Sequence, residues 1–159
     1  GAWLAELHQR EPELFDIDGL EYREVFSVTR ASGGIANNII PPTFEINLNY
    51  RFPPVFTIEE AVGRLRLLAL AADEVEIVDR APSAPVPEGN PHLDRLVDVT
   101  GGERAAKQGW TDVARLAIHG VPAVNYGPGI VAQAHQVNEH VPLGNLDIAF
   151  DNLKKVLTR

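Results

Sequence analysis

The sequence predicts an α+β protein in two parts, and three observations lead to this prediction. Residues 1–80 show periodicities in the order helix, strand, strand, helix, strand. Residues 81–91 contain four of the 12 prolines in the chain, and this density is typical of a linker or an extended crossing between layers. Beyond this segment the pattern changes to short helices around one apolar run. We therefore expect one domain over residues 1–81 and a second over residues 82–159.

The first part is expected to begin with a short helix and two strands. Residues 2–10 have the spacing of a helix with one apolar face, and residues 16–19 have the composition of a turn. Residues 22–30 are rich in β-formers, and the glycine-containing segment 31–34 is expected to end this strand. Residues 45–52 alternate between apolar and polar side chains, which indicates a strand with one buried face.

A capping box marks the start of the next helix. Thr57 is followed three residues later by Glu60, and each side chain can satisfy a free backbone amide near the other. The helix is expected to run to about residue 72, and residues 74–80 are expected to form another strand. One further strand in front would complete β-α-β-β-α-β, the ferredoxin-like pattern. The first part is therefore predicted to be a ferredoxin-like domain without its first strand, cut from a longer protein.

The second part is expected to contain short helices around a buried strand. The spacing predicts helices over residues 92–99 and 111–119, with Thr111 or Asp112 as the N-cap of the latter. Residues 121–126 form an apolar run suited to the middle of a sheet. A final helix should bury one face that carries Leu146, Ala149, Phe150, Leu153 and Leu157.

Composition and charge exclude several classes of function. The chain has no cysteine, which excludes disulfides and thiolate zinc sites. It has no apolar run of about eighteen residues, so no membrane-spanning helix is expected. The formal charge of −8 and the lack of a basic cluster argue against nucleic-acid binding. The first residues are too acidic for a signal peptide, so the cytoplasm is the expected compartment.

Two residues near the end of the chain could belong to a metal site. His135 follows a Gly-Pro loop after the apolar run, where an imidazole could be held as a zinc ligand. Glu139, four residues later, could orient that histidine. The alternative for His135 is a surface-loop histidine with no ligand role.

Other polar residues could contact a ligand, and each also has a structural interpretation. Arg51 could clamp a substrate carboxylate with its guanidinium fork, or it could pair with a cross-strand acid. Asp112 could lie at a site, or it could cap a helix. Asn37 and Asn38 could present amides to a ligand, or they could shape a turn.

Two stretches resemble the M20 family of dinuclear zinc amidohydrolases. Asn37-Asn-Ile-Ile-Pro41 and Asn47-Leu-Asn-Tyr-Arg51 look like a segment of the lid, or dimerisation, domain of this family. Gly109-Trp-Thr-Asp112 through Glu139 is similar to the closing segment of the catalytic domain. Within the family, the sequence is most similar to the succinyl-diaminopimelate desuccinylases. The resemblance implies a partial lid over residues 1–81 and the C-terminal portion of a zinc-peptidase-like, mixed-sheet catalytic domain over residues 82–159.

The resemblance also implies a role for each candidate residue. His135 would bind one of two zinc ions per full-length subunit, for which cobalt could substitute, and Glu139 would support it. Arg51 would contact the substrate carboxylate. Asn37 and Asn38 would reach the substrate in the opposite subunit of a homodimer. The substrate pocket would be lined by Gly109, Thr111 and Asp112.

The implied reaction is the hydrolysis of N-succinyl-LL-2,6-diaminopimelate to succinate and LL-2,6-diaminopimelate, in lysine and cell-wall biosynthesis. In the family, the H-x-D motif, the bridging aspartate, the Glu-Glu pair with the general base and the lid G-x-x-G-H motif belong upstream of the segments matched here. No H-x-D in a suitable context occurs in this chain, and residues 131–133 replace a family asparagine. The chain is therefore expected to be an incomplete and inactive part of the enzyme. The alternatives are another M20 activity on an N-acyl amino acid or peptide (acetylornithine deacetylase, aminoacylase or peptidase), a non-catalytic dimerisation and substrate-contact fragment, and an α+β interaction module.

Overall fold

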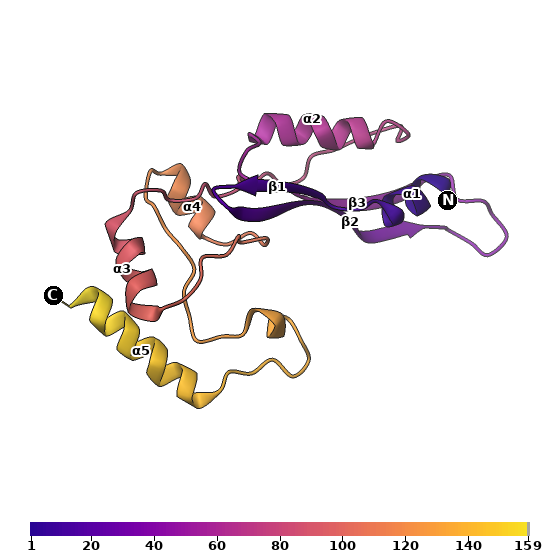
Figure 1. Cartoon of the computed structure of the whole chain (residues 1–159). Helices are drawn as coiled ribbons and strands as arrows, with labels where there is room; N and C mark the ends of the chain where they lie inside the picture. The colour runs from indigo at the N-terminus through magenta and orange to yellow at the C-terminus, as the bar shows by residue number, and fades with distance from the viewer. Residues whose placement is uncertain (159) are drawn as a thin grey trace.

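The computed structural model describes residues 1–158 and shows a mixed α/β protein with two parts (Figure 1). The first part contains a three-stranded antiparallel sheet in the order β1-β2-β3. Its elements are α1 (Ala2–Gln9), β1 (Glu13–Ile17), β2 (Leu20–Gly33), β3 (Phe44–Arg51) and α2 (Ile58–Leu68). The elements of the second part are α3 (Pro91–Thr100), α4 (Val113–Ile118), the 3-10 helix η1 (Val131–Gln133) and α5 (Leu143–Leu157). No helix in residues 1–158 has the length and apolar character needed to cross a membrane.

The sheet begins with a hairpin whose turn, but not whose first strand, is predicted by the sequence. The turn predicted at residues 16–19 is present, with Gly19 at φ 74° and its N–H donating to Asp16 Oδ1 at 3.2 Å. The preceding residues form β1, which pairs antiparallel with the start of β2. No strand was predicted there, because β1 has only five residues and most of them are exposed.

Strand β2 continues past the break predicted at residues 31–34. It pairs with β3 as far as Gly33 opposite Phe44, with a register shift between Val28 and Arg30. A Cβ atom at Gly33 would lie 2.8 Å from the Phe44 ring. The glycine therefore allows the two strands to approach closely at the end of the ladder, and it does not end the strand.

The alternation predicted for residues 45–52 is confirmed in β3. Ile46, Leu48 and Tyr50 are half-buried, and the residues between them are exposed. Tyr50 stacks on Phe26 of β2, with ring centroids 4.1 Å apart and planes 9° apart. The buried face of the sheet is thus set by period-two side chains, as the sequence indicated.

The capping box at the start of α2 is also confirmed. The Glu60 N–H donates to Thr57 Oγ1 at 3.2 Å, and the Thr57 N–H donates to Glu60 Oε2 at 2.8 Å. The backbone and side-chain hydrogen bonds from Thr57 lower the pKa of the Glu60 carboxyl. Helix α2 ends at Leu68, four residues before the predicted end near residue 72.

We expect Thr57→Ala to destabilise the first part by about 1 kcal/mol, because the change removes the side-chain acceptor at the N-cap of α2. The capping contribution of the Glu60 carboxylate should be present above its unfolded pKa and lost as the pH falls through its lowered folded pKa. Hydrogen exchange of the α2 amides measures this loss. Thr43→Ala, at an exposed loop threonine, is the matched control and should leave the same amides unchanged.

A buried ion-pair network connects α2 to the sheet. Glu24 on β2 is 2% exposed, and Arg64 on α2 donates to it from Nε at 2.6 Å and from Nη2 at 2.8 Å. The Tyr50 hydroxyl on β3 donates to the same carboxylate, and Arg64 Nη2 also donates to Glu13 on β1 at 3.0 Å. The Arg64 guanidinium lies 4.6 Å from the centre of the Phe56 ring. One arginine therefore links the helix to all three strands.

Two predicted strands are absent. Residues 74–80 and 121–126 are extended, but neither pairs with another strand within residues 1–158. Val124 is 41% exposed, so the burial predicted for residues 121–126 is wrong, and Val78 in the other segment is 75% exposed. A β-strand forms when a neighbouring strand accepts its hydrogen bonds, and an apolar sequence alone does not supply that neighbour. The described residues therefore do not complete a ferredoxin-like sheet.

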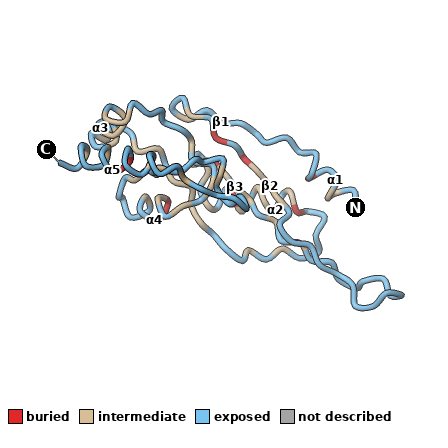
Figure 2. The backbone as a smooth tube through the Cα atoms, turned by 90° about the horizontal axis from the view of Figure 1, so that it is seen from below, coloured by how far each residue is buried: buried red, intermediate tan, exposed pale blue. Residues whose placement is uncertain are grey.

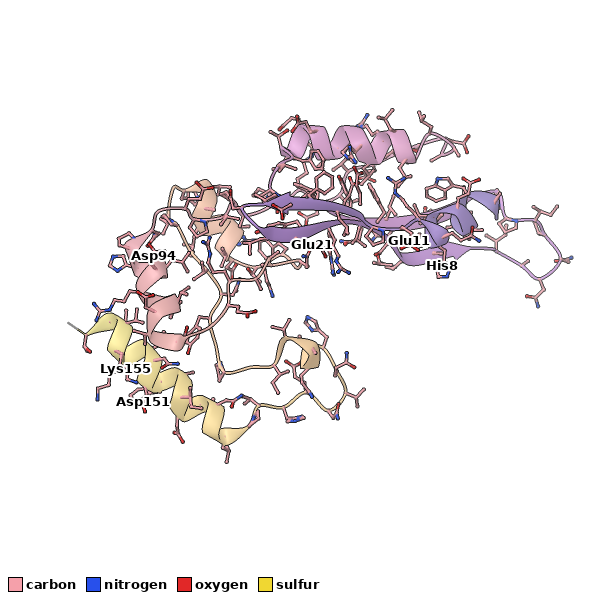
Figure 3. All side chains as sticks on the ribbon, viewed as in Figure 1. His8, Glu11, Glu21, Asp94, Asp151 and Lys155 are labelled. Carbon is pink, nitrogen blue, oxygen red and sulfur yellow. The ribbon has the colours of Figure 1, made fainter. Side chains whose placement is uncertain are left out.

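The second part is built on the pairing of α3 with α5. Helix α3 begins at the Asn90 cap and ends at Gly101, which confirms the helix predicted near residues 92–99. It packs against α5, and Arg95 Nη2 donates to the carbonyl oxygens of Lys155 at 2.7 Å and Thr158 at 2.8 Å. In Figure 3 the charged side chains labelled on these two helices lie on the outer surface.

The buried face of α5 differs from the prediction. Ala149 is buried as predicted, but its half-buried neighbours are Asn145, Asn152 and Val156. Phe150 is 66% exposed and Leu157 is 79% exposed, and the other predicted leucines also face outward. Few of the residues that the structure describes are fully buried (Figure 2). Helix α5 therefore packs on α3 through the side that carries Ala149, and the larger apolar side chains of α5 remain exposed.

Candidate functional site

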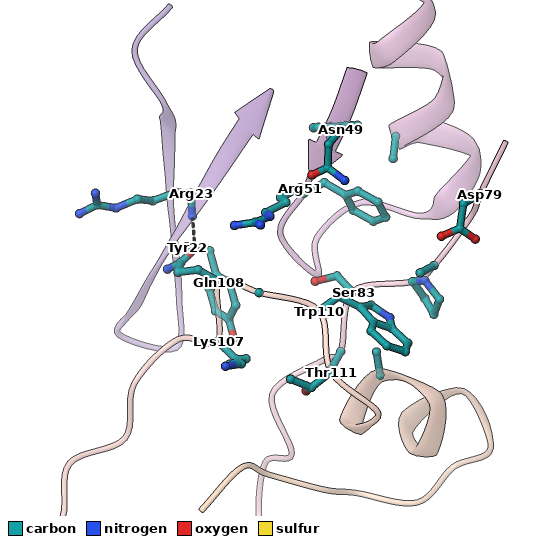
Figure 4. Close-up of a pocket in the computed structure, with 18 of the residues that line it drawn as sticks. Tyr22, Arg23, Asn49, Arg51, Asp79, Ser83, Lys107, Gln108, Trp110 and Thr111 are labelled. Atoms are coloured by element: carbon teal, nitrogen blue, oxygen red, sulfur yellow. Dashed lines mark hydrogen bonds between the residues drawn. The ribbon is translucent and has the colours of Figure 1, made fainter. Parts of the chain in front are cut away.

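A broad open hollow runs along β3 and α2 and continues to the loop before α4, and Figure 4 shows part of its wall. Four of the eight predicted site residues line it, and they come from three separate segments. These four residues are Arg51, Gly109, Thr111 and His135. Asn49, Tyr22 and Trp110 also line this hollow.

The other four predicted residues lie outside this lining. Asn37 and Asn38 form an exposed turn at the tip of the β2–β3 loop. This tip lies at the end of the sheet farthest from the second part (Figure 1). Asp112 and Glu139 are exposed residues next to lining segments. Within one chain, the two asparagines are therefore not part of the lining of the hollow.

Arg51 lies at the end of β3, opposite Val25 of β2. Its place on the exposed side of the alternating strand follows from the sequence pattern. The structural alternative was an ion pair with a cross-strand acid, and none of the ion pairs within residues 1–158 involves Arg51. Its guanidinium fork is therefore available to a carboxylate ligand.

The loop before α4 brings a threonine and a tryptophan to the hollow. Thr111 Oγ1 accepts a hydrogen bond of 3.2 Å from Asn125 Nδ2, and the Arg115 guanidinium lies 5.3 Å from the centre of the Trp110 ring. Helix α4 covers Val113–Ile118, shorter than predicted, and the Asp112 side chain makes no capping hydrogen bond. Asp112 therefore occupies the predicted N-cap position, but it does not cap the helix through its side chain, because its backbone is already in a helical conformation.

His135 lies in an irregular loop after η1. Its backbone is in the left-handed region at φ 64°, and its N–H donates to Glu139 Oε2 at 2.9 Å. Glu139 therefore holds the backbone of the loop that carries the imidazole. No group of three or more His, Cys, Asp or Glu side chains in residues 1–158 could hold a metal ion. His135 thus provides one potential ligand, and the described residues alone do not form a metal centre.

Two further residues that line the hollow had no role predicted from the sequence. Burial and the nearby Asp18 carboxylate raise the pKa of the Tyr22 hydroxyl, so Tyr22 presents a neutral phenol to the hollow. Gln108 hydrogen-bonds to the backbone of β2, more than eighty residues away in the sequence. Its position directly before Gly109 is a sequence signal, but no local pattern indicates so distant a partner.

Comparison with known proteins identifies the first part. Residues 3–74 match the family model described as the peptidase dimerisation domain of the M20 family. The chain carries an M20 peptidase dimerisation domain. The match begins within α1 and ends a few residues after α2, so the M20 domain includes the whole three-stranded sheet. The resemblance to the M20 family is confirmed.

Several relatives match the chain over a longer range than the dimerisation domain alone. A Mycobacterium tuberculosis protein, named with the succinyl-diaminopimelate desuccinylases (DapE), is 40% identical over 158 residues, covering 99% of this chain and 45% of the relative. The succinyl-diaminopimelate desuccinylase of Corynebacterium glutamicum is 36% identical over 148 residues, covering 90% of this chain and 40% of the relative. The N-acetyl-L-citrulline deacetylase of Xanthomonas campestris is 28% identical over 142 residues, covering 83% of this chain and 38% of the relative. The chain spans less than half the length of these relatives.

Proposed function

We propose that this chain is part of an M20 amide hydrolase that converts N-succinyl-LL-2,6-diaminopimelate to succinate and LL-2,6-diaminopimelate. The observation that carries this proposal is the 40% identity along 99% of the chain to a relative named with these desuccinylases. The hollow supports it, because Arg51, Thr111 and His135 lie on the wall of one open site large enough for a small-molecule amide. The relatives are about twice as long as the chain, so the catalytic unit is proposed to include a further part.

Residues 1–81 are proposed to form the ferredoxin-like lid without its first strand, and residues 82–159 the C-terminal part of the catalytic domain. The dimerisation match ends at Glu74, close to the proposed boundary. The uncovered apolar side of α5 and the unpaired run 121–126 support the second assignment. In a complete domain, apolar surfaces of this kind are covered by neighbouring elements.

Each residue on the wall has a proposed binding role. The Arg51 fork would hold a substrate carboxylate, and Gly109 and Thr111 would form the pocket wall next to Asp112. Asn37 and Asn38 would contact the substrate of a second subunit in a homodimer. The exposure of these two asparagines at the loop tip supports this role, because they do not reach the hollow of their own chain.

His135 is proposed to bind one of two zinc ions, for which cobalt could substitute, with the other ligands and the general base supplied by the part of the enzyme that this chain does not include. When bound, such a metal polarises a carbonyl and lowers the pKa of its water. The contribution of this chain is to hold the imidazole. The hydrogen bond from the His135 N–H to Glu139 fixes the backbone beside the ligand.

The test uses the full-length enzyme, by which we mean the native protein that contains this chain and its proposed upstream part. Purified protein with zinc is assayed side by side with N-succinyl-LL-2,6-diaminopimelate and N-acetylornithine. We expect succinate release, with kcat/KM for the succinyl substrate at least about a hundredfold higher, a difference of about 2.7 kcal/mol in transition-state binding. Equal or reversed preference would contradict the desuccinylase assignment.

Two alternatives remain, each supported by its own observation. The match to the N-acetyl-L-citrulline deacetylase, and a 31% match to a protein named as a probable carboxypeptidase of Aspergillus terreus, favour another M20 deacylation or peptide hydrolysis. The lack of a metal-binding group in residues 1–158 favours a non-catalytic dimerisation and substrate-contact protein. A native product of only this length that is dimeric, metal-free and inactive would establish the second alternative.

We expect Arg51→Ala in the full-length enzyme to raise KM for the succinyl substrate by about tenfold and to change kcat less, because a clamp on a remote carboxylate contributes to binding. Steady-state kinetics measure both constants. Arg66→Ala, at an exposed arginine on α2, is the control and should leave both unchanged. An unchanged KM for Arg51→Ala would remove this residue from the substrate site.

A further inference from the structure

We propose that Gln108 is a positioning residue that holds the pocket loop against the edge of β2. The proposal rests on the proposed function. The Arg23 N–H donates to Gln108 Oε1 at 3.1 Å, and Gln108 Nε2 donates to the Glu21 carbonyl oxygen at 2.8 Å. Figure 4 shows the bond to Arg23 beside Arg51 and the loop residues. Both partners are backbone groups, so the contact depends on the amide of Gln108 and not on the side chains of Glu21 and Arg23.

The backbone groups that Gln108 binds on β2 have no strand partner, because β3 is too short to reach them. Strand β3 ends at Arg51, which lies opposite Val25, so the side of β2 that faces β3 has no strand partner before Val25. An unpaired strand edge presents alternating N–H and C=O groups. The Gln108 amide supplies one acceptor and one donor and so replaces the missing strand over residues 21–23.

This contact is a hydrogen-bonded connection between the two parts. Among the hydrogen bonds within residues 1–158, the two from Gln108 are those that join residues 1–80 to residues 90–158. Gly109 follows directly, and Thr111 is held in turn by Asn125. The position of the loop relative to the sheet is therefore fixed at Gln108, immediately before the residues that line the hollow.

The same contact sets the distance between the loop and Arg51. Arg23 lies two residues along β2 from Val25, the register partner of Arg51, which is roughly 7 Å along an extended strand. A loop released from this edge would change its separation from Arg51, even though Gln108 itself does not contact the substrate. Small displacements of positioning groups are costly to turnover and binding.

The experiment compares Gln108→Ala and Gln108→Glu in the full-length enzyme, with Gln9→Ala at the exposed end of α1 as the matched control. Gln108→Ala removes both bonds. Gln108→Glu keeps an acceptor for the Arg23 N–H but places a carboxylate oxygen against the Glu21 carbonyl oxygen. Two readouts are taken: kcat and KM for N-succinyl-LL-2,6-diaminopimelate, and hydrogen exchange of the Arg23 amide.

We expect Gln108→Ala to raise KM about tenfold, with a smaller change in kcat, and to speed exchange of the Arg23 amide about tenfold, as the loss of two exposed hydrogen bonds predicts. Gln108→Glu should retain protection of the Arg23 amide and raise KM less. Exchange at Ser27 and Asn49, which pair directly in the β2–β3 ladder, should be unchanged in both variants, which separates positioning from unfolding.

Unchanged exchange at Arg23 in Gln108→Ala would overturn the contact, and faster exchange with unchanged KM would overturn its positioning role. Failure of the proposed function has a different signature, namely that the unmodified enzyme does not hydrolyse the succinyl substrate. In that case the exchange measurement still tests the contact, because it needs no turnover.

Discussion

His135→Ala in the full-length enzyme is expected to remove one of two bound zinc ions and to lower kcat/KM by at least about a hundredfold. Loss of an outer partner of a metal ligand already costs about 10- to 100-fold, so loss of the ligand itself should cost more. His135 is the one metal ligand that this chain is proposed to supply. The left-handed backbone at His135 and the bond to Glu139 also fix the position of this one imidazole.

Metal content per subunit, measured by elemental analysis after gel filtration, tests the ligand role independently of activity. His140→Ala is the matched control, since His140 is an exposed histidine in the same segment whose ring contacts the Asn138 carbonyl oxygen at 2.8 Å. The control should keep both metal ions and full activity. Two zinc ions per subunit in His135→Ala would disprove the ligand assignment, whatever the activity.

The parts of the fold that the sequence predicted correctly depend on short-range chemistry. The Thr57 and Glu60 capping box needs only a spacing of three residues, and the alternation in β3 needs only one buried side. The predictions that were wrong concern segments whose structure depends on contacts with distant parts of the chain. Residues 121–126 have the composition of a central strand but no neighbouring strand, and the buried side of α5 was decided by its packing on α3.

The candidate site divides in the same way. The exposed position of Arg51 and the loop position of His135 follow from local pattern, and both residues line the same broad hollow. The contact of Gln108 with β2 could not be predicted from the sequence, because it depends on where β3 ends relative to β2. Local sequence thus identified several side chains of the wall, and the three-dimensional fold was needed to identify what positions them.

Arg64→Ala is expected to destabilise the dimerisation domain by about 3–5 kcal/mol, because it leaves the carboxylate of Glu24 buried without its cation. Arg64 provides two hydrogen bonds to this carboxylate, and Tyr50 alone would remain. Burial raises the pKa of the Glu24 carboxyl, but the hydrogen bonds from Arg64 and Tyr50 lower this pKa by more, so its net shift is downward. Hydrogen exchange of the β2 and β3 amides measures the unfolding free energy of this sheet.

The pH dependence should differ between the unmodified protein and the Arg64 variant. With Arg64 present, the lowered pKa of Glu24 contributes stability above the unfolded pKa, and this stability is lost as the pH falls through the folded pKa. Without Arg64, burial dominates and raises the pKa of Glu24, so protonation relieves the buried charge and the deficit of the variant should shrink in acid. Arg66→Ala, at an exposed arginine two residues away on α2, should cost less than about 0.5 kcal/mol at any pH. Equal losses in the two variants, or a deficit for Arg64→Ala that grows in acid, would show that the network does not hold α2 on the sheet.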